Sequence, residues 1–395
     1  MVNREPLQHV APMTASPLPP MTRPRLALTC GDPAGIGPEV AVAAAHDRRV
    51  REVCEPVLFG SLAAIEEAAR RLKLKVTCDL VPVEGEAVPL GTPSAAAGQI
   101  AYDSLQQALG QCLQSQRGAP PEGDHHASSQ PQASTQTQAG SRKVEPESGR
   151  IEGLVTAPLN KFSLSLAGVP FPGHTEILGQ HAVDAGRFAM MLHVPPGDDS
   201  PVAGPHGLSI VHVTLHTSVA SVPKLLTRAA VVDGIRLLAR DLPRLGCREP
   251  RIAVASLNPH GGEGGLFGDE EERTIAPAVA QANQQRLTRV AVAGPLPCDT
   301  LIRRAVQGEF DAVVAMYHDQ GHIPVKLIAF DQAINITLGL PIVRTSPTHG
   351  TAFDLVGRGR ANAAGMIGAV RTAAAMVAAD AARDPSSFEQ QEATA

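Results

Sequence analysis

The fold is decided by a stretch near the start of the chain, residues 25–45, which reads RLALTCGDPAGIGPEVAVAAA. A short apolar run ends in a loop rich in glycine and proline, and an alanine- and valine-rich segment follows, which predicts a strand, a loop and a helix. The same order recurs at VLFG followed by SLAAIEEAARRLKL, where Ser61 suits a helix N-cap, and at KVTCDLV followed by a helix over 94–112. Alternating strands and helices predict an α/β fold with a largely parallel, helix-covered sheet.

This alternation stops between residues 111 and 149 and then resumes. The segment holds one leucine, one valine and no aromatic residue, so it cannot offset its ordering entropy by burial, and we expect a disordered insertion. Its two histidines, His125 and His126, have no third ligand nearby and are more typical of a solvated loop than of a metal site. Residues 1–24 hold six prolines and no continuous apolar run, which predicts a disordered leader rather than a signal peptide. A second, smaller loop insertion is predicted at 195–207.

After residue 149, five apolar runs predict strands: IEGLVT, LSIVHVTLH, RIAVASLNPH, RVAVAGPLP and DAVVAMYHD. Helices are predicted around 222–240, from 269, from 299 and over 361–382. No apolar run approaches the roughly 20 residues that span a bilayer. The sequence therefore predicts a globular α/β fold without a membrane-spanning segment.

Composition excludes several classes of function. Lys and Arg number 34 against 39 Asp and Glu, for a net charge of −5, which argues against a dedicated nucleic-acid or anionic-membrane binder. Aromatic residues make up 3%, too few for platforms that stack single-stranded bases. The six cysteines are widely spaced and form no CxxC pair, so a reducing cytosol is the expected compartment.

Three predicted strands run directly into a histidine: VHVTLH ends at His216, AVASLNPH at His260 and AVVAMYH at His318. Ligands of open α/β sheets bind at the C-terminal ends of the strands. Three imidazoles leave a fourth coordination position open, as in a catalytic metal site, and Zn²⁺ is the expected ion, with Mg²⁺ or Co²⁺ as alternatives. Asp319 and Asp299 are predicted as metal ligands, as carboxylates that orient a ligand, or as a base. For Asp299 a helix N-cap is an equal alternative.

A second set of residues is suited to an anion. His174 and Thr175 lie in the turn FPGHTE, and GHIPVK, INITLGLP and IVRTS supply Lys326, Asn335 and Arg344. A point charge, an amide and a planar guanidinium match phosphate or carboxylate. Taken alone, each of these residues also fits an ordinary surface or turn position, Asn335 most of all. The chain has no GxGxxG, P-loop or GxSxG motif, which weakens the Rossmann, NTPase and serine-hydrolase interpretations.

At these residues the chain resembles the 4-hydroxythreonine-4-phosphate dehydrogenase family of vitamin B6 biosynthesis. Eight motifs occur in the family's order over about 25–111 and 149–382: GDPAGIGPE, TAPLNK, FPGHTE, LNPHGGEGG, GPLPCDT, AMYHDQG, NITLGLP and RTSPTHGTAFDLVGRG. The resemblance implies an isocitrate/isopropylmalate-dehydrogenase-like fold, two α/β domains with the active-site cleft between them, and a homodimer. We expect residues 25–110 and 299–385 to form the first domain and 150–298 the second, which would carry dimer contacts and metal ligands.

The resemblance also implies roles for single residues. His216, His260 and His318 match the family's metal ligands, near a dimer interface to which both subunits contribute. His174, Thr175, Lys326, Asn335 and Arg344 match its substrate-binding positions. Asp299, Asp319 and Lys326 are our candidate catalytic residues, and no residue is assigned to the cofactor. The family oxidises 4-phosphooxy-L-threonine with NAD or NADP, and the β-keto acid product loses CO₂ to give 3-amino-2-oxopropyl phosphate.

Three alternatives remain at this stage. Relatives in the same superfamily act on 4-phospho-threonate or -erythronate, or on a cis-dihydrodiol dicarboxylate, and they need the same kinds of residues. A metal-dependent hydrolase would use the three histidines to activate water and would work without NAD. A non-catalytic sugar-phosphate sensor should carry a DNA-binding module, and no basic helix-turn-helix stands out.

Overall fold

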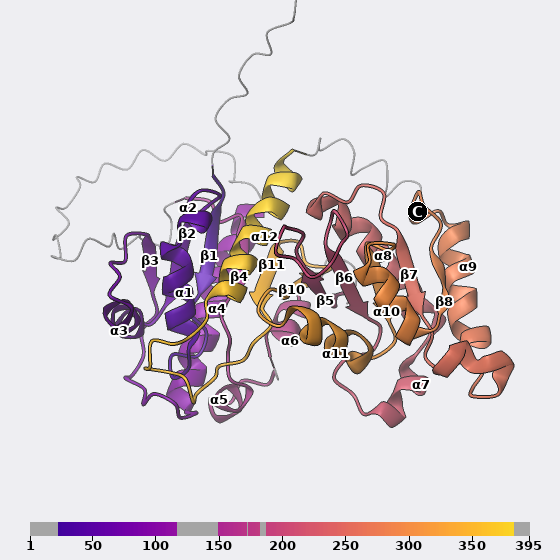
Figure 1. Ribbon diagram of the computed structural model, residues 1–395. Coiled ribbons are helices and arrows are strands. Elements are labelled where there is room, and N and C mark those ends of the chain that lie inside the picture. Colours follow the sequence, from indigo (N-terminus) through magenta and orange to yellow (C-terminus); the bar gives the residue numbers. More distant parts are fainter. Residues whose placement is uncertain (1–22, 117–148, 172, 182–186, 383–395) are drawn as a thin grey trace, which may run out of the picture.

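The computed structural model (Figure 1) describes residues 23–116, 149–171, 173–181 and 187–382. Eleven strands form one continuous sheet in the order β3-β2-β1-β4-β11-β10-β5-β6-β9-β7-β8. The strands are β1 Arg25–Thr29, β2 Glu55–Gly60, β3 Asp79–Pro82, β4 Gly153–Thr156, β5 Ala189–Val194, β6 Leu208–His212, β7 Ile252–Ala255, β8 Ala293–Leu296, β9 Ala312–Ala315, β10 Ile334–Leu338 and β11 Val343–Pro347.

Helices cover both faces of this sheet. They are α1 Gly37–His46, α2 Arg48–Arg51, α3 Leu62–Leu72, α4 Ala95–Gln116, α5 Lys161–Leu166, α6 His174–Gly179, α7 Val222–Leu225, α8 Arg228–Asp241, α9 Ala276–Gln284, α10 Cys298–Val306, α11 His318–Ala329 and α12 Ala364–Ala381. Short 3₁₀ or π turns occupy Val219–Ser221, Leu242–Leu245, Pro259–Gly265 and Glu271–Ile275. The α/β fold predicted from the sequence is confirmed.

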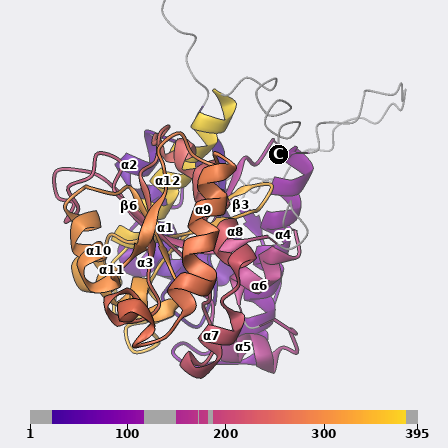
Figure 2. The same cartoon turned by 90° about the vertical axis from the view of Figure 1, so that its right-hand side faces the viewer.

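The sheet is parallel at both ends and antiparallel in the middle. Strands β3, β2, β1, β4 and β11 run parallel, as do β6, β9, β7 and β8, while β10 and β5 pair antiparallel with each other and with their outer neighbours. Because adjacent strands are rotated in one sense, eleven strands accumulate a large twist. Figure 2 shows the effect, since α4 and α10 lie on opposite sides of the molecule in that view.

The strand order groups the chain differently from the division that we expected. β4, expected in the second domain, lies between β1 and β11, whereas β9, expected in the first, lies between β6 and β7. The helix predicted to end at residue 112 continues to Gln116, and the one predicted over 222–240 is two helices, with Thr227 capping the second. A sequence pattern gives the order of elements along the chain, whereas neighbours in a sheet depend on long-range pairing. The remainder of the predicted insertion, most of the leader and residues 383–385 lie outside the described residues.

The core consists of two layers of side chains, one on each face of the sheet, and only one of these layers is continuous. On one face a single cluster runs the length of the sheet and joins α1, α12, α8 and α9, with Leu28, Val155, Ile336 and Val254 among its strand residues. On the other face the core is divided into a cluster under α4, α5 and α6 and a separate cluster under α10 and α11. α12 is the one helix of the described ranges long and apolar enough to cross a membrane, and it packs instead on β11 and β4.

Candidate functional site

The pocket lies on the divided face, over the central strands and between the two clusters. It has a volume of about 290 Å³ and brings together residues from β4, β5, β10, β11, α5, α6, α11 and the loop after β6. The alternation of the strands explains its polar floor. In β10 and β11, Ile336 and Val343 point into the continuous core, so Asn335 and Arg344, one residue away, point to the opposite face. Of our predicted site residues, seven line this pocket: His174, Thr175, His216, His318, Lys326, Asn335 and Arg344.

Arg344 is the most constrained charge of the pocket. Its side chain is 3% exposed, and it donates from Nη1 to Thr337 Oγ1 at 2.9 Å and from Nη2 to Thr156 Oγ1 at 2.6 Å. Burial lowers the pKa of Arg344 to about 10, so the guanidinium is still charged at neutral pH. Its Nε is buried without a hydrogen-bond partner, and within the described ranges no carboxylate lies in ion-pair distance. A buried, unpaired charge is costly, so this arrangement favours a bound anion.

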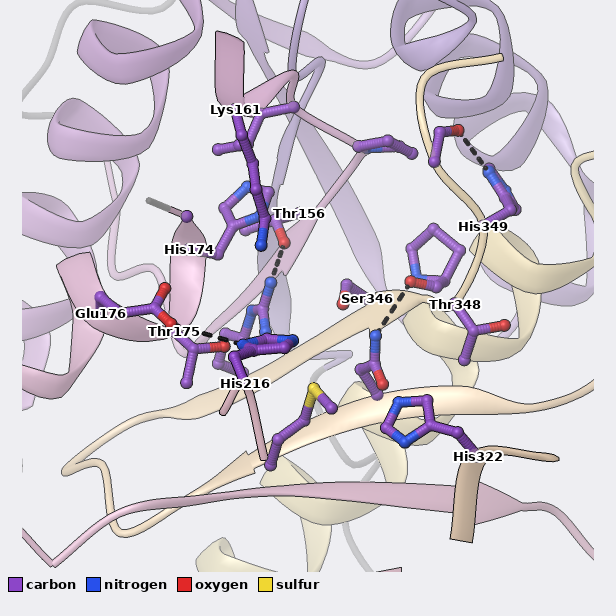
Figure 3. A pocket seen from close by; sticks show the side chains of 18 of the residues that line it. Thr156, Lys161, His174, Thr175, Glu176, His216, His322, Ser346, Thr348 and His349 are labelled. Carbon is purple, nitrogen blue, oxygen red and sulfur yellow. Dashed lines mark hydrogen bonds and ion pairs between the residues drawn. The ribbon is translucent and has the colours of Figure 1, made fainter. Parts of the chain in front are cut away.

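The short helix α6 brings His174, Thr175 and Glu176 to the rim (Figure 3). Burial, with a smaller contribution from the charge of Arg344, holds the pKa of His174 well below its usual value, so the imidazole is neutral and serves as a hydrogen-bonding group. Glu176 approaches His216, with 3.8 Å between Oε1 and Nδ1. This contact is the largest cause of the lowered pKa of Glu176, and burial opposes it. Helix α6 thus connects pocket-lining side chains with a predicted metal ligand.

Helix α11 presents one face to the pocket, with His318, His322 and Lys326 at successive turns. The rings of His318 and His322 stack at 3.8 Å with an interplanar angle of 6°, and His322 Nδ1 lies 3.2 Å from His212 Nε2. Burial, the largest cause, lowers the pKa of His322 to about 4 and that of His212 to about 3. Gly321 permits this packing, because a Cβ there would lie 2.3 Å from His212 Nε2.

The three predicted metal ligands follow three adjacent parallel strands, as expected. His216 lies four residues beyond the end of β6, His318 three beyond β9 and His260 five beyond β7. The ring centroids of His216 and His318 are 6.2 Å apart, and both residues line the pocket. His260 lies in the turn 259–265 with 69% of its side chain exposed and is not among the residues lining the pocket. The residues that the structure describes contain no group of three or more potential metal ligands within one copy of the chain.

The two candidate carboxylates lie outside the pocket itself. Asp319 accepts a hydrogen bond at 2.7 Å from Nδ1 of His318 and faces a neighbouring hollow of about 440 Å³, which His216 and Tyr317 also line. Asp299 lies in the first turn of α10, where its Oδ1 accepts from the backbone N–H of Thr300 at 2.9 Å. The N-cap of α10 is Pro297, so the alternative that Asp299 is the N-cap is wrong, although Asp299 does lie in the first turn. His125 and His126 lie outside the described residues.

Several lining residues were missed from the sequence. Lys161 begins α5, directly after the N-cap Asn160, and reaches the pocket beside His174, while His349 lines it from the loop after β11. His322 was detectable, because its spacing of four residues from both His318 and Lys326 places all three on one helix face. The alternating polar residues of INIT and VRTS also indicated a polar sheet face. Lys161 had no signal beyond its place in the motif TAPLNK.

Comparison with known proteins identifies the family. A family model described as pyridoxal phosphate biosynthetic protein PdxA matches residues 124–373, more than half of the chain. A 4-hydroxythreonine-4-phosphate dehydrogenase of Geobacter metallireducens is 40% identical over 90% of this chain and 96% of its own. An Oceanobacillus iheyensis relative, named for D-threonate 4-phosphate dehydrogenase, is 34% identical over 89% of this chain and 97% of its own. The crystal structure of a 4-hydroxythreonine-4-phosphate dehydrogenase from Klebsiella pneumoniae has a TM-score of 0.68 at 31% identity and covers 90% of this chain and 100% of its own. The chain therefore belongs to the PdxA family of pyridoxal phosphate biosynthetic proteins.

Proposed function

We propose that the protein oxidises the secondary alcohol of 4-phosphooxy-L-threonine with NAD or NADP, and that the β-keto acid so formed loses CO₂ to give 3-amino-2-oxopropyl phosphate in pyridoxal 5′-phosphate biosynthesis. Family membership and the names of the relatives support this proposal. The structural observation that carries it is the buried guanidinium of Arg344, which has no carboxylate partner among the described residues and shares a pocket with two predicted metal ligands.

The anionic groups of the substrate would bind on the floor and rim of the pocket. Arg344 offers a free Nε, and Lys161 and Lys326 add two positive charges. The unpartnered Oδ1 of Asn335 is an acceptor, so it would face a donor group of the substrate, such as its hydroxyl or ammonium group. Because the nearby His174 is neutral, it would donate or accept a hydrogen bond without adding charge. Three cations against Glu176 leave an excess of positive charge, which suits a substrate that carries both a phosphate and a carboxylate.

A divalent ion would sit beside His216 and His318. The donor set fits such an ion, since imidazole nitrogen is a good ligand for Zn²⁺ and the rings of His216 and His318, which follow neighbouring strands, line the same pocket. Mg²⁺ and Co²⁺ are the alternatives. We propose His260 of a second copy of the chain as the third ligand, because His260 of the same chain does not line this pocket.

Exposed apolar residues near this site support a homodimer. On α11, which also carries His318, Ile323 is 60% exposed and Leu327 is 83% exposed, and Phe330, directly after the helix, is 60% exposed. Leu266 and Phe267, which follow the turn that carries His260, are 72% and 49% exposed. Side chains of this size on one surface are typical of an interface. A second copy that covers α11 would bring its own turn 259–265 toward His216 and His318.

The roles of the chain's own residues follow from these positions. When bound, the ion would lower the pKa of the substrate hydroxyl and stabilise negative charge on its oxygen, and the nicotinamide would accept the hydride. Lys326 lines the pocket and is positioned to bind the substrate or, as an ammonium ion, to donate a proton. Asp299 and Asp319 are the candidates for the proton acceptor. Asp299→Asn and Asp319→Asn test this role through kcat and its pH profile. Wild-type values in both variants would remove the carboxylates from proton transfer.

All six cysteines are free, which supports a reducing cytosol as the compartment.

The decisive assay offers the purified protein a panel of phosphorylated hydroxy acids with NAD⁺ and NADP⁺ and follows reduced cofactor and CO₂. We expect turnover of 4-phosphooxy-L-threonine with release of CO₂. Preference for 4-phospho-threonate, for 4-phospho-erythronate or for a cis-dihydrodiol dicarboxylate would contradict the proposal and place the protein with other relatives. Hydrolysis of a substrate in the absence of NAD⁺ and NADP⁺ would contradict the assignment of the protein as a dehydrogenase.

A further inference from the structure

Each of the three histidines that we propose as metal ligands has a carboxylate beside its Nδ1. Asp319 Oδ1 lies 2.7 Å from Nδ1 of His318. Glu263 Oε2 lies 3.3 Å from Nδ1 of His260. Glu176 Oε1 lies 3.8 Å from Nδ1 of His216. The three pairs come from different elements and different sequence spacings, so a repeated local motif does not explain the common geometry.

A neutral imidazole carries one proton and offers its lone pair from the other nitrogen. A carboxylate at Nδ1 keeps the proton there, orients the ring and makes Nε2 the better donor to a metal. We infer that Asp319, Glu263 and Glu176 are positioning residues that hold all three imidazoles ready to bind a metal ion through Nε2. The inference rests on the proposed metal site and names residues that act through the ligands rather than on the substrate.

The ring of His318 is held from two directions. Asp319 fixes it in its plane through the 2.7 Å hydrogen bond, and His322 stacks on its face at 3.8 Å. Both partners come from α11, so the orientation of the ring moves with the helix. Asp319 is 54% exposed, which means that its place is not dictated by core packing. This contact gives Asp319 a function other than that of a base.

The pair His260 and Glu263 stands in an unusual backbone. All five residues from 260 to 264 have positive φ, including His260 at 52° and Glu263 at 46°, where residues with a side chain are disfavoured. The left-handed turn places these two side chains on the same side, although both are well exposed, at 69% and 57%. Backbone strain at two exposed residues that carry side chains is typical of a functional constraint.

Glu176 links the ligand to the substrate pocket. It shares α6 with His174 and Thr175, which line the pocket, and it contacts His216 on the loop after β6. Because its contact is the longest of the three, at 3.8 Å, we expect it to contribute least to metal affinity in the free protein. The expected order is therefore Asp319, then Glu263, then Glu176.

The test measures Zn²⁺ affinity directly. The full-length protein is stripped with a chelator, Zn²⁺ is returned in competition with a chromophoric chelator, and the melting temperature of the metal-free form is recorded. Asp319→Asn should weaken Zn²⁺ binding about 10- to 100-fold, with smaller losses for Glu263→Gln and Glu176→Gln and no change in metal-free melting temperature. Asp319→Glu, which keeps a carboxylate, should recover part of the affinity. Asp269→Asn, a carboxylate near the same turn that pairs with Arg273, is the matched control and should bind as the wild type does.

The outcomes separate this inference from the proposed function. If the three carboxamide variants keep wild-type Zn²⁺ affinity while His318→Ala loses it, the metal site stands and the positioning role is wrong. If His318→Ala and His260→Ala also bind as the wild type does, the proposed metal site itself is wrong. If Asp319→Asn folds poorly, Glu263→Gln still tests the positioning role, because Glu263 lies on an exposed turn and its substitution should not affect folding.

Discussion

The floor of the pocket and the rim that carries the predicted metal ligands are built on different principles. On the floor, Arg344 and Asn335 belong to paired strands, and Arg344 is fixed by hydrogen bonds to two threonines. On the rim, His216 and His318 lie beyond the strand ends and are 49% and 37% exposed. His260 is 69% exposed on a separate turn.

This difference shows which part of the site is formed entirely by residues of one copy of the chain. Backbone pairing fixes a side chain on a central strand in direction and depth, so the polar floor, which we propose binds the substrate's anionic groups, is formed within a single copy. Side chains after strand ends depend on loop geometry and on neighbours. The rim therefore needs carboxylates to orient its rings and, in our proposal, a second copy to supply the third ligand.

The largest effect is expected for the rim. His260→Ala should lose the metal and lower kcat by about 1000-fold or more, because the ion supplies several kcal/mol of charge stabilisation to the reaction. The metal-free melting temperature should be unchanged, since the His260 side chain is largely exposed. Metal content and the formation of reduced nicotinamide are the measurements. Full activity without bound metal would overturn the assignment.

Mixing two inactive variants tests whether the rim is shared between copies. In a hybrid dimer of His260→Ala with His318→Ala, one of the two sites would receive His216 and His318 from one copy and His260 from the other. Random exchange should then restore about a quarter of the wild-type activity. Each variant incubated alone is the control. No recovery, under conditions where hybrids are shown to form, would mean that each copy builds its metal site alone.

The floor should respond differently. Arg344→Met should lower kcat/KM about 10- to 100-fold through lost charge-assisted hydrogen bonds to the substrate. Its melting temperature should stay equal or rise, because removing a buried unpaired charge relieves a desolvation cost. Metal affinity should be unaffected, which distinguishes floor from rim. Arg289→Met, at an exposed ion pair with Glu249, controls for the general loss of a charge, and an equal loss there would contradict the role of Arg344.

The smallest effect is a pH dependence of stability in the same sheet. Burial lowers the pKa of His193, on β5, to about 4, and its Nδ1 pairs with Ser209 Oγ at 2.9 Å. The unfolded chain takes up a proton that the folded chain excludes, so this contribution is full above pH 6.5 and is lost as the pH falls toward 4. His193→Gln should reduce the fall in melting temperature between about pH 7 and pH 5 by about 2 to 4 °C. The exposed His46, changed to Gln, should leave that fall as it is.

Much of the fold was predictable because its signals are local. The apolar run at 25–29, the Gly/Pro loop and the helix that follows all reflect neighbouring residues, and the strand-helix alternation identified the α/β class. The division of the chain between the two ends of the sheet was not predictable in this way. Nothing in the residues of β4 states that it pairs with β1 and β11, since that pairing depends on contacts distant in sequence.

The candidate site followed the same rule. Seven of the residues that line the pocket could be predicted, because their residue types and motifs indicate metal or anion binding. Lys161 and His349 were missed because a lysine after a helix cap and a histidine in a loop fit many positions equally well. His322 could have been predicted from its helical spacing to His318 and Lys326. Its stacking on His318 could not have been predicted from the sequence.

The sequence by itself determined the α/β class, the family and the chemical character of the site, because residue types and short motifs carry that information. Only the tertiary structure decided that Arg344 is buried without an anion, that His260 stands apart from His216 and His318, and that each of these three histidines has a carboxylate at Nδ1. These are properties of distance and burial. They arise when the strands β10, β11, β6 and β9 come together in one twisted sheet, which no short segment of the chain specifies alone.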